Sequence, residues 1–213
     1  MKIEVVSDVI CPWCFIGKRN MDAALAELAQ DGVNFEVGFR PFQLNPDMPK
    51  GGVPRAEYRI AKFGSLAKSH ELDERVTAAG KAAGIDFDFA SMKRTPNTLA
   101  AHRLVRLAQD VGRQPAVKEA LMTAYFLDGR DIESPEVLAN IARQYGVDPA
   151  LLETDTYMAE VEEQDQAARE GGISGVPSFL MNGYFLFSGA VPPDALMESF
   201  RKARVVLMGR GEV

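Results

Sequence analysis

Apolar and polar side chains alternate along two short stretches near the start of the chain. Residues 2–6 carry β-branched side chains with a period close to two, and residues 33–40, VNFEVGFR, alternate more clearly, so both stretches predict strands. Between them, apolar side chains recur at helical spacing at Phe15, Met21, Leu25 and Leu28. The glycine that follows, Gly32, is typical of a helix end, so this stretch predicts a helix. This order predicts two parallel strands joined through a helix by a right-handed crossover.

From about Asn45 the pattern changes to a loop rich in proline and glycine, followed by successive helices with no convincing strand before about Arg169. The apolar spacing predicts helices near residues 54–67, 69–83, 95–111, 115–127, 134–145 and 154–170. The starts of three of them are indicated by the pairs Thr95-Pro96, Gln114-Pro115 and Ser134-Pro135.

The strand pattern returns in residues 179–181 and 184–187, and a last helix is predicted over residues 192–208. Asn182 and Gly183 suit a two-residue hairpin turn because both tolerate a positive φ. The two ends of the chain need each other to complete one sheet. We therefore predict an α/β fold whose small domain, residues 1–45 and 165–213, is interrupted by an all-helical insertion, residues 46–164.

Composition narrows the class of protein. The 213 residues are 46% hydrophobic and 25% charged, with neither repeats nor low-complexity runs, which is typical of a globular protein. The 24 basic and 30 acidic residues give a net charge of −6, which argues against nucleic acid as a partner. The apolar runs are too short for a membrane span, and MKIEVVSD is too short and acidic for a signal-peptide core. We therefore expect a cytoplasmic protein that binds neither nucleic acid nor membranes.

The only two cysteines stand three positions apart in SDVICPWC, residues 7–14. Cys11 lies where the first strand gives way to a helix, and Pro12 suits the first helical position, where a missing N–H is harmless. The positive end of the helix favours a thiolate at Cys11, while Cys14 follows on the same face within disulfide reach. We predict Cys11 as the nucleophile and Cys14 as the resolving thiol of a disulfide exchange.

Two other interpretations of the cysteine pair are weaker. A structural bridge between Cys11 and Cys14 would close a loop too short to constrain the unfolded chain. A metal site would need His70 and His102 as well, and their spacing matches no zinc-finger pattern. We expect no metal and no cofactor beyond the redox-active pair itself, and glutathione is a candidate co-substrate.

Four stretches together resemble the DsbA-like disulfide oxidoreductases of the thioredoxin fold, and within them the cytoplasmic FrnE-like branch. They are SDVICPWC at 7–14, NTLAAHRL at 97–104, YFLDGRDI at 125–132 and SGVPSFLMNG at 174–183. The resemblance implies a thioredoxin-like fold with a helical insertion. It also implies a thiol-disulfide oxidoreductase or isomerase that acts on thiols and disulfides of proteins or peptides.

The resemblance implies further site residues. In thioredoxin-like proteins a cis proline packs beside the cysteine pair, and the resemblance assigns this role to Pro177. The residue before that proline offers its backbone to an extended substrate, and the resemblance assigns this role to Val176. The insertion helix with NTLAAHRL faces the active site in relatives, so Asn97 and His102 are candidates for the pocket. A lone histidine on an apolar helix face is, however, more often structural.

Three residues near the cysteines have open roles. Pro12 and Trp13 are candidates for substrate contact, because Trp13 points outward if Cys14 points inward, although an ordinary packed aromatic is as good an interpretation. Asp8 either assists proton transfer to the buried thiol or serves a turn or helix cap.

Two other functions stay open. A glutathione-dependent isomerase of the 2-hydroxychromene-2-carboxylate type shares the fold and the insertion, but has serine where this chain has Cys11. A polyketide-pathway accessory role has been suggested for some FrnE-like relatives, and no residue argues against it. We expect a monomer or a weak homodimer.

Overall fold

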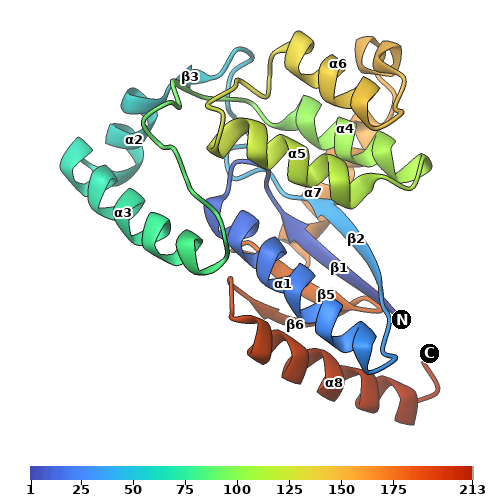
Figure 1. The fold of residues 1–213 in the computed structure, drawn as a ribbon. Helices are drawn as coiled ribbons and strands as arrows, with labels where there is room; N and C mark the ends of the chain where they lie inside the picture. The colour runs from blue at the N-terminus through green and yellow to red at the C-terminus, as the bar shows by residue number, and fades with distance from the viewer. Residues whose placement is uncertain (213) are drawn as a thin grey trace.

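A four-stranded mixed sheet with the strand order β2-β1-β5-β6 forms the base of the computed structural model, which describes residues 1–212 (Figure 1). Its strands are β1 (Lys2–Ser7), β2 (Glu36–Pro41), β5 (Ser178–Met181) and β6 (Tyr184–Ser188). β1 runs parallel to β2 and antiparallel to β5, so that Val5 lies opposite both Phe39 and Phe179. All four strands predicted from the sequence are present.

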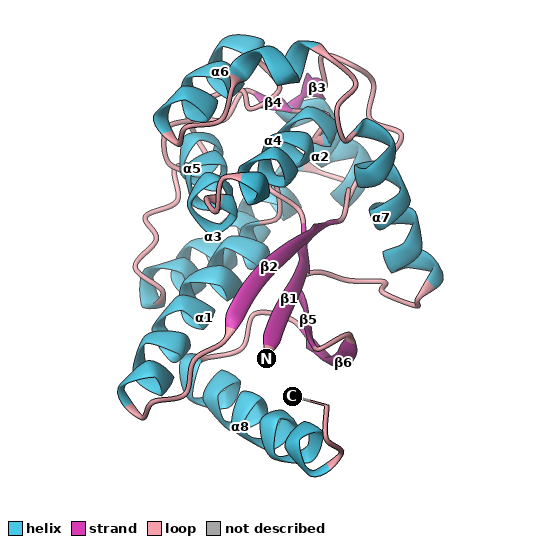
Figure 2. Cartoon of the chain, turned by 90° about the vertical axis from the view of Figure 1, so that its right-hand side faces the viewer, coloured by secondary structure: helices cyan, strands magenta, loops and turns pink. Residues whose placement is uncertain are grey.

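Helices cover both faces of this sheet (Figure 2). α1 (Pro12–Gln30) and α8 (Pro193–Gly209) pack together, and their Met21 and Phe200 belong to the same buried cluster as Val5. On the opposite face, Val6 and Leu180 pack with Ala168 of α7 (Met158–Glu170). Successive residues of β1 thus serve two different layers.

The insertion contributes the remaining helices. They are α2 (Arg55–Phe63), α3 (Leu66–Ala82), α4 (Leu99–Asp110), α5 (Gln114–Phe126), α6 (Pro135–Gln144) and the 3-10 helix η1 (Pro149–Glu153). Each predicted helix is present, with ends that differ by at most four residues from the prediction. α7 runs across the predicted domain boundary between residues 164 and 165.

The prediction of an insertion without strands is wrong. β3 (Val53–Pro54) and β4 (Arg94–Thr95) form a short antiparallel ladder, which is too short to give any periodicity in the sequence. Because Thr95 belongs to β4, the helix predicted to begin at Thr95-Pro96 begins at Leu99 instead. The side chain of Asn97 accepts a hydrogen bond from the Leu99 backbone N–H at 2.9 Å and helps to set this later start.

One cluster of buried side chains runs through both parts of the chain. Phe15 of α1 stacks on Phe126 of α5 with ring centroids 6.0 Å apart, and both belong to the cluster that contains Val5 and Phe179 of the sheet. The insertion therefore shares its core with the sheet. Within residues 1–212, the structure contains no helix with the length and apolar character needed to cross a membrane.

Candidate active site

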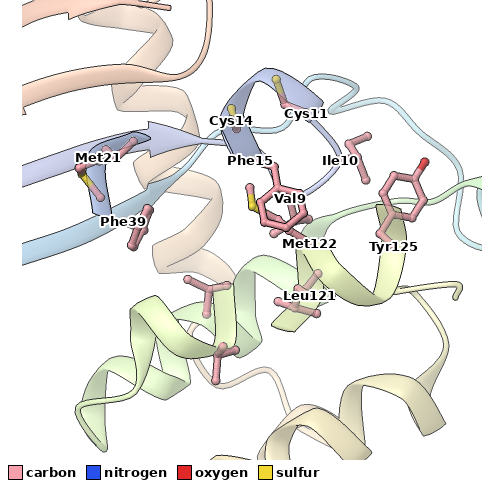
Figure 3. Close-up of a cluster of buried hydrophobic side chains, with 14 of the residues drawn as sticks. Val9, Ile10, Cys11, Cys14, Phe15, Met21, Phe39, Leu121, Met122 and Tyr125 are labelled. Carbon is pink, nitrogen blue, oxygen red and sulfur yellow. The ribbon is translucent and has the colours of Figure 1, made fainter. Parts of the chain in front are cut away.

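The cysteine pair lies at the junction of β1 and α1, as predicted. Cys11 is the N-cap of α1, with φ −92° and ψ 113°, and Pro12 occupies the first helical position. The backbone N–H groups of Cys14 and Phe15 donate to the Cys11 carbonyl at 3.0 and 3.2 Å, which places both cysteines in the first helical turn. Figure 3 shows the two sulfur atoms beside each other at this turn.

The two thiols are free and lie in different environments. Both are buried, with Cys11 5% and Cys14 2% exposed, but only Cys11 lines the cavity described below. Burial raises the pKa of the Cys14 thiol well above its ordinary value, and the neighbouring Cys11 raises it further. Cys14 therefore holds its proton, and of the two cysteines only Cys11 lines the cavity.

A loop from the C-terminal part of the chain lies against this turn. The Val176-Pro177 peptide bond is cis, as the resemblance implies, and the Val176 carbonyl oxygen lies 3.7 Å from Cys11 Sγ. A methyl group at position 17 of α1 would lie only 2.9 Å from Cγ of Pro177, so Gly17 permits the close approach of helix and loop.

Asp8 and His102 form a buried pair behind the cysteines. Asp8 Oδ1 lies 3.1 Å from His102 Nε2, and Asp8 Oδ2 accepts a hydrogen bond from the Leu44 backbone N–H at 2.7 Å. Burial opposes ionisation of Asp8, yet His102, the Leu44 N–H and Lys118 together lower the pKa of Asp8 below its ordinary value. Burial lowers the pKa of His102. The pair is thus a carboxylate that accepts a hydrogen bond from a neutral imidazole.

Sequence reasoning missed Lys118 of α5, a buried cation whose charge acts on Cys14 and Asp8. Its side chain is fully buried, and Nζ donates to the Ser7 carbonyl at 3.1 Å. Burial lowers the pKa of Lys118 to about 8, against the opposing effect of Cys14, Asp8 and Cys11. The signal was present in the sequence: Lys118 shares one helix face with the apolar residues Leu121, Met122 and Tyr125.

The structure does not bring Asn97 or His102 to the cavity beside Cys11. The Asn97 side chain donates to the Met48 carbonyl at 2.6 Å and accepts from the Leu99 N–H, so it holds the loop before α4. His102 contacts Asp8 below the floor of the site. Pro12 and Trp13 do line the cavity, and Trp13 is 39% exposed.

The cavity has a volume of about 430 Å³. One wall is formed by the first turn of α1 and by Val176, and the wall opposite is formed by α2 and α3 of the insertion. A cavity of this size accommodates a small molecule or a few side chains of a larger partner.

No group of three or more histidine, cysteine, aspartate or glutamate side chains within residues 1–212 is arranged to hold a metal ion. His70 lies exposed on α3, whereas His102 is buried on α4.

The chain matches a known protein family and is similar to solved structures of the same fold. The family described as the DSBA-like thioredoxin domain matches residues 2–201. The structure is similar to the probable DsbA oxidoreductase SCO1869 from Streptomyces coelicolor, with 30% identity, a TM-score of 0.84, and coverage of 95% of this chain and 89% of that one.

Two more distant structures share the fold. A 2-hydroxychromene-2-carboxylate isomerase is 17% identical, with a TM-score of 0.69 and full coverage of both chains. The cytosolic disulfide reductase DsbM from Pseudomonas aeruginosa is 16% identical, with a TM-score of 0.66 and coverage of 97% of this chain and 100% of that one.

Proposed function

This chain belongs to the DSBA-like thioredoxin domain family, and we propose that it exchanges disulfides with protein or peptide substrates through Cys11 and Cys14. The observation that carries the proposal is the asymmetry of the pair. Cys11 lines the cavity and its Sγ lies 3.7 Å from the Val176 carbonyl, whereas Cys14 does not line the cavity. An extended substrate that hydrogen-bonds to the backbone at Val176 would present its disulfide to Cys11.

The exchange proceeds in two steps. The Cys11 thiolate attacks one sulfur of the substrate disulfide, which forms a mixed disulfide and releases the other substrate sulfur as a thiolate. Cys14 then loses its proton and attacks Cys11 Sγ, so that the second substrate thiolate leaves and the Cys11-Cys14 disulfide forms. The enzyme gives up two electrons to the substrate, and the reverse sequence oxidises a substrate dithiol.

The buried groups bear on the second step. Because burial holds the proton on Cys14, this thiol does not compete with Cys11 for the incoming substrate. The positive charge of Lys118 and a backbone hydrogen bond at Asp8 act in the opposite sense and lower the pKa of Cys14. These groups favour the Cys14 thiolate once a mixed disulfide occupies Cys11.

A glutathione-dependent isomerisation is the second candidate, because an isomerase of 2-hydroxychromene-2-carboxylate has the same fold over its whole length. Cysteine at position 11, where that class has serine, favours disulfide exchange. Glutathione as a co-substrate is compatible with either reaction. The cytosolic location of DsbM supports our proposal that this protein also acts in the cytoplasm.

Cysteine variants test the proposal. We expect Cys11→Ser to abolish insulin-disulfide reduction and the refolding of scrambled ribonuclease, because the attacking sulfur is gone. Cys14→Ser should retain the first step and accumulate mixed disulfides with substrate, which mass spectrometry detects. Full activity in Cys11→Ser would contradict the proposal, and stoichiometric glutathione binding with chromene turnover would favour the isomerase.

The direction of exchange is accessible through Trp13, which is the only tryptophan and lines the cavity beside Cys11. Fluorescence titration against glutathione redox buffers would give the potential of the pair. A value near that of thioredoxin, about −270 mV, indicates a reductant, and a clearly higher value indicates an oxidant or isomerase.

A further inference from the structure

The wall of the cavity opposite Cys11 carries an excess of positive charge. α2 and α3 contribute four cationic side chains and one carboxylate to this wall, namely Arg55, Arg59, Lys62, Arg75 and Asp73. The whole protein, in contrast, has a net charge of −6. This local reversal of sign favours an anionic ligand next to the reactive sulfur.

Asp73 neutralises only part of this charge. Its Oδ2 lies 2.8 Å from Nη2 of Arg55 and its Oδ1 lies 2.7 Å from Nη2 of Arg59, so one carboxylate serves two guanidinium groups. Burial lowers the pKa of Arg59 despite the opposing effect of Asp73. An additional anion would therefore stabilise the charged form of this pair.

The two arginines differ in how many of their donors are used. Arg59 also donates from Nε to Ser69 Oγ at 2.6 Å and from Nη2 to the Ser69 carbonyl at 2.9 Å. Arg55 donates only from Nη2, and its Nε and Nη1 have no hydrogen-bond acceptor among residues 1–212. Arg55 is thus the guanidinium with donors left for a ligand carboxylate.

The rest of this wall is apolar. Arg55 lies over the ring of Phe89 at 5.4 Å and Arg59 over the ring of Phe63 at 4.4 Å, so each cation stands against an aromatic face. Val76 and Met92 extend the same surface. A ligand that fits this wall has an apolar or aromatic body with an anionic group at one end.

We propose that the cavity selects low-molecular-weight disulfides and thiols that carry a carboxylate on a short apolar or aromatic body. The carboxylate binds at Arg55, the body packs against Phe63 and Phe89, and the sulfur lies at Cys11. A volume of about 430 Å³ holds such a molecule in full, whereas a protein substrate would enter it with only a few side chains. The inference rests on the proposed function, since it names a substrate class for the same two cysteines.

Two aromatic disulfides test this selection with the reduced full-length protein. Dithiobis(nitrobenzoate) carries a carboxylate on each ring, and dithiodipyridine carries none. With either probe, Cys11 forms a mixed disulfide and releases one aromatic thiolate, and Cys14 then releases the second as the Cys11-Cys14 disulfide forms. Both releases are followed by absorbance in a stopped-flow experiment.

We expect Arg55→Gln to slow the reaction with dithiobis(nitrobenzoate) about tenfold or more, because a charge-assisted hydrogen bond is lost, and to leave the rate with dithiodipyridine within about twofold. Arg55→Lys should recover part of the loss. The matched control is Arg201→Gln, which removes the same charge from an exposed position on α8 outside the cavity and should change neither rate.

The outcomes separate this inference from the proposed function. If Arg55→Gln changed the rates with both probes equally, or changed neither, the proposed selection for a carboxylate would be overturned. The proposed disulfide exchange would not be affected by that result. Failure of the wild type to form the Cys11-Cys14 disulfide with either probe would overturn both.

A second measurement needs no variant. Benzoate should slow alkylation of Cys11 by iodoacetamide, and benzamide at the same concentration should not. Equal effects of the two compounds would count against the carboxylate site.

Discussion

The insertion contains two pairs of helices that are attached to the molecule in different ways. α4 and α5 carry many buried residues and pack against α7, β2 and α1. α2 has no buried residue, and α3 buries only Ser69, Asp73, Val76 and Gly80. In Figure 1, α2 and α3 stand to one side of the molecule, whereas α4 and α5 lie over the sheet.

The difference separates two tasks. The buried pair of helices supplies His102, which contacts Asp8, and Lys118, whose positive charge lowers the pKa of Cys14. The exposed pair supplies Arg55 and Arg59, which face the cavity. Under the proposed function, the groups that tune the reaction lie in the buried pair of helices, and the groups that face the ligand lie in the exposed pair.

The largest effect on stability is expected from shortening a buried side chain in the pair α4 and α5. Leu121 on α5 is 0% exposed, so Leu121→Ala should lower the free energy of unfolding by about 2–5 kcal/mol. Leu66 on α3 is 44% exposed, and Leu66→Ala should change it by no more than about 0.5 kcal/mol. Urea unfolding measures both. Similar losses in the two variants would remove the distinction between the pairs.

A second effect concerns the pH dependence of stability. The pKa of Lys118 is about 8 in the folded protein and 10.5 when unperturbed, so between these values the unfolded state binds the extra proton and the contribution of Lys118 to stability rises with pH. The gap corresponds to about 3 kcal/mol. The raised pKa of Cys14 acts in the opposite sense, so the contribution of Lys118 is the difference between wild type and variant. Lys118→Met should lack this rise, which urea unfolding at several pH values would reveal.

Lys62→Met on the exposed α2 is the control for this experiment, because Lys118 is still present and the rise should persist. An identical pH dependence in wild type and Lys118→Met would show that Lys118 is as well solvated when folded as when unfolded.

The smallest effect is expected for the contact between α2 and α3, the exposed pair of helices. Asp73 joins α2 to α3 through Arg55 and Arg59, so Asp73→Asn should speed amide hydrogen exchange in residues 55–63 by about tenfold. Exchange in residues 99–110 of α4 should stay as in the wild type. Mass spectrometry of the corresponding peptides makes the comparison, and equal acceleration in both helices would contradict it.

What the sequence predicted well is local. Cys11, Pro12 and Cys14 lie within one helical turn, so their relation follows from helix geometry alone. The strands β1, β2, β5 and β6 follow from alternation, and β2 begins at Glu36 rather than Val33 because the Val33 N–H closes the end of α1 on the Leu28 carbonyl at 2.9 Å.

What the sequence missed depends on contacts between distant segments. The β3 and β4 ladder has too few residues for a pattern, and Asp8 meets His102 only after the insertion folds over β1. The pairing of Arg55 and Arg59 with Asp73 across two helices has no signature in residue spacing. In the sequence, the charged residues of the cavity wall cannot be told from those of an ordinary solvent-exposed helix face, because the ion pairs depend on how the two helices pack.

Gly17 has a consequence for how the entrance to the site can vary. Because a methyl group there would contact Pro177, a larger residue would force the loop away from α1 and carry the Val176 carbonyl with it. If a substrate backbone binds at Val176 as proposed, the width of the slot between Val176 and Cys11 is therefore set by Gly17, on the inner side of α1. Adjusting this slot, by selection or by design, would begin with a change at Gly17 that leaves both cysteines in place.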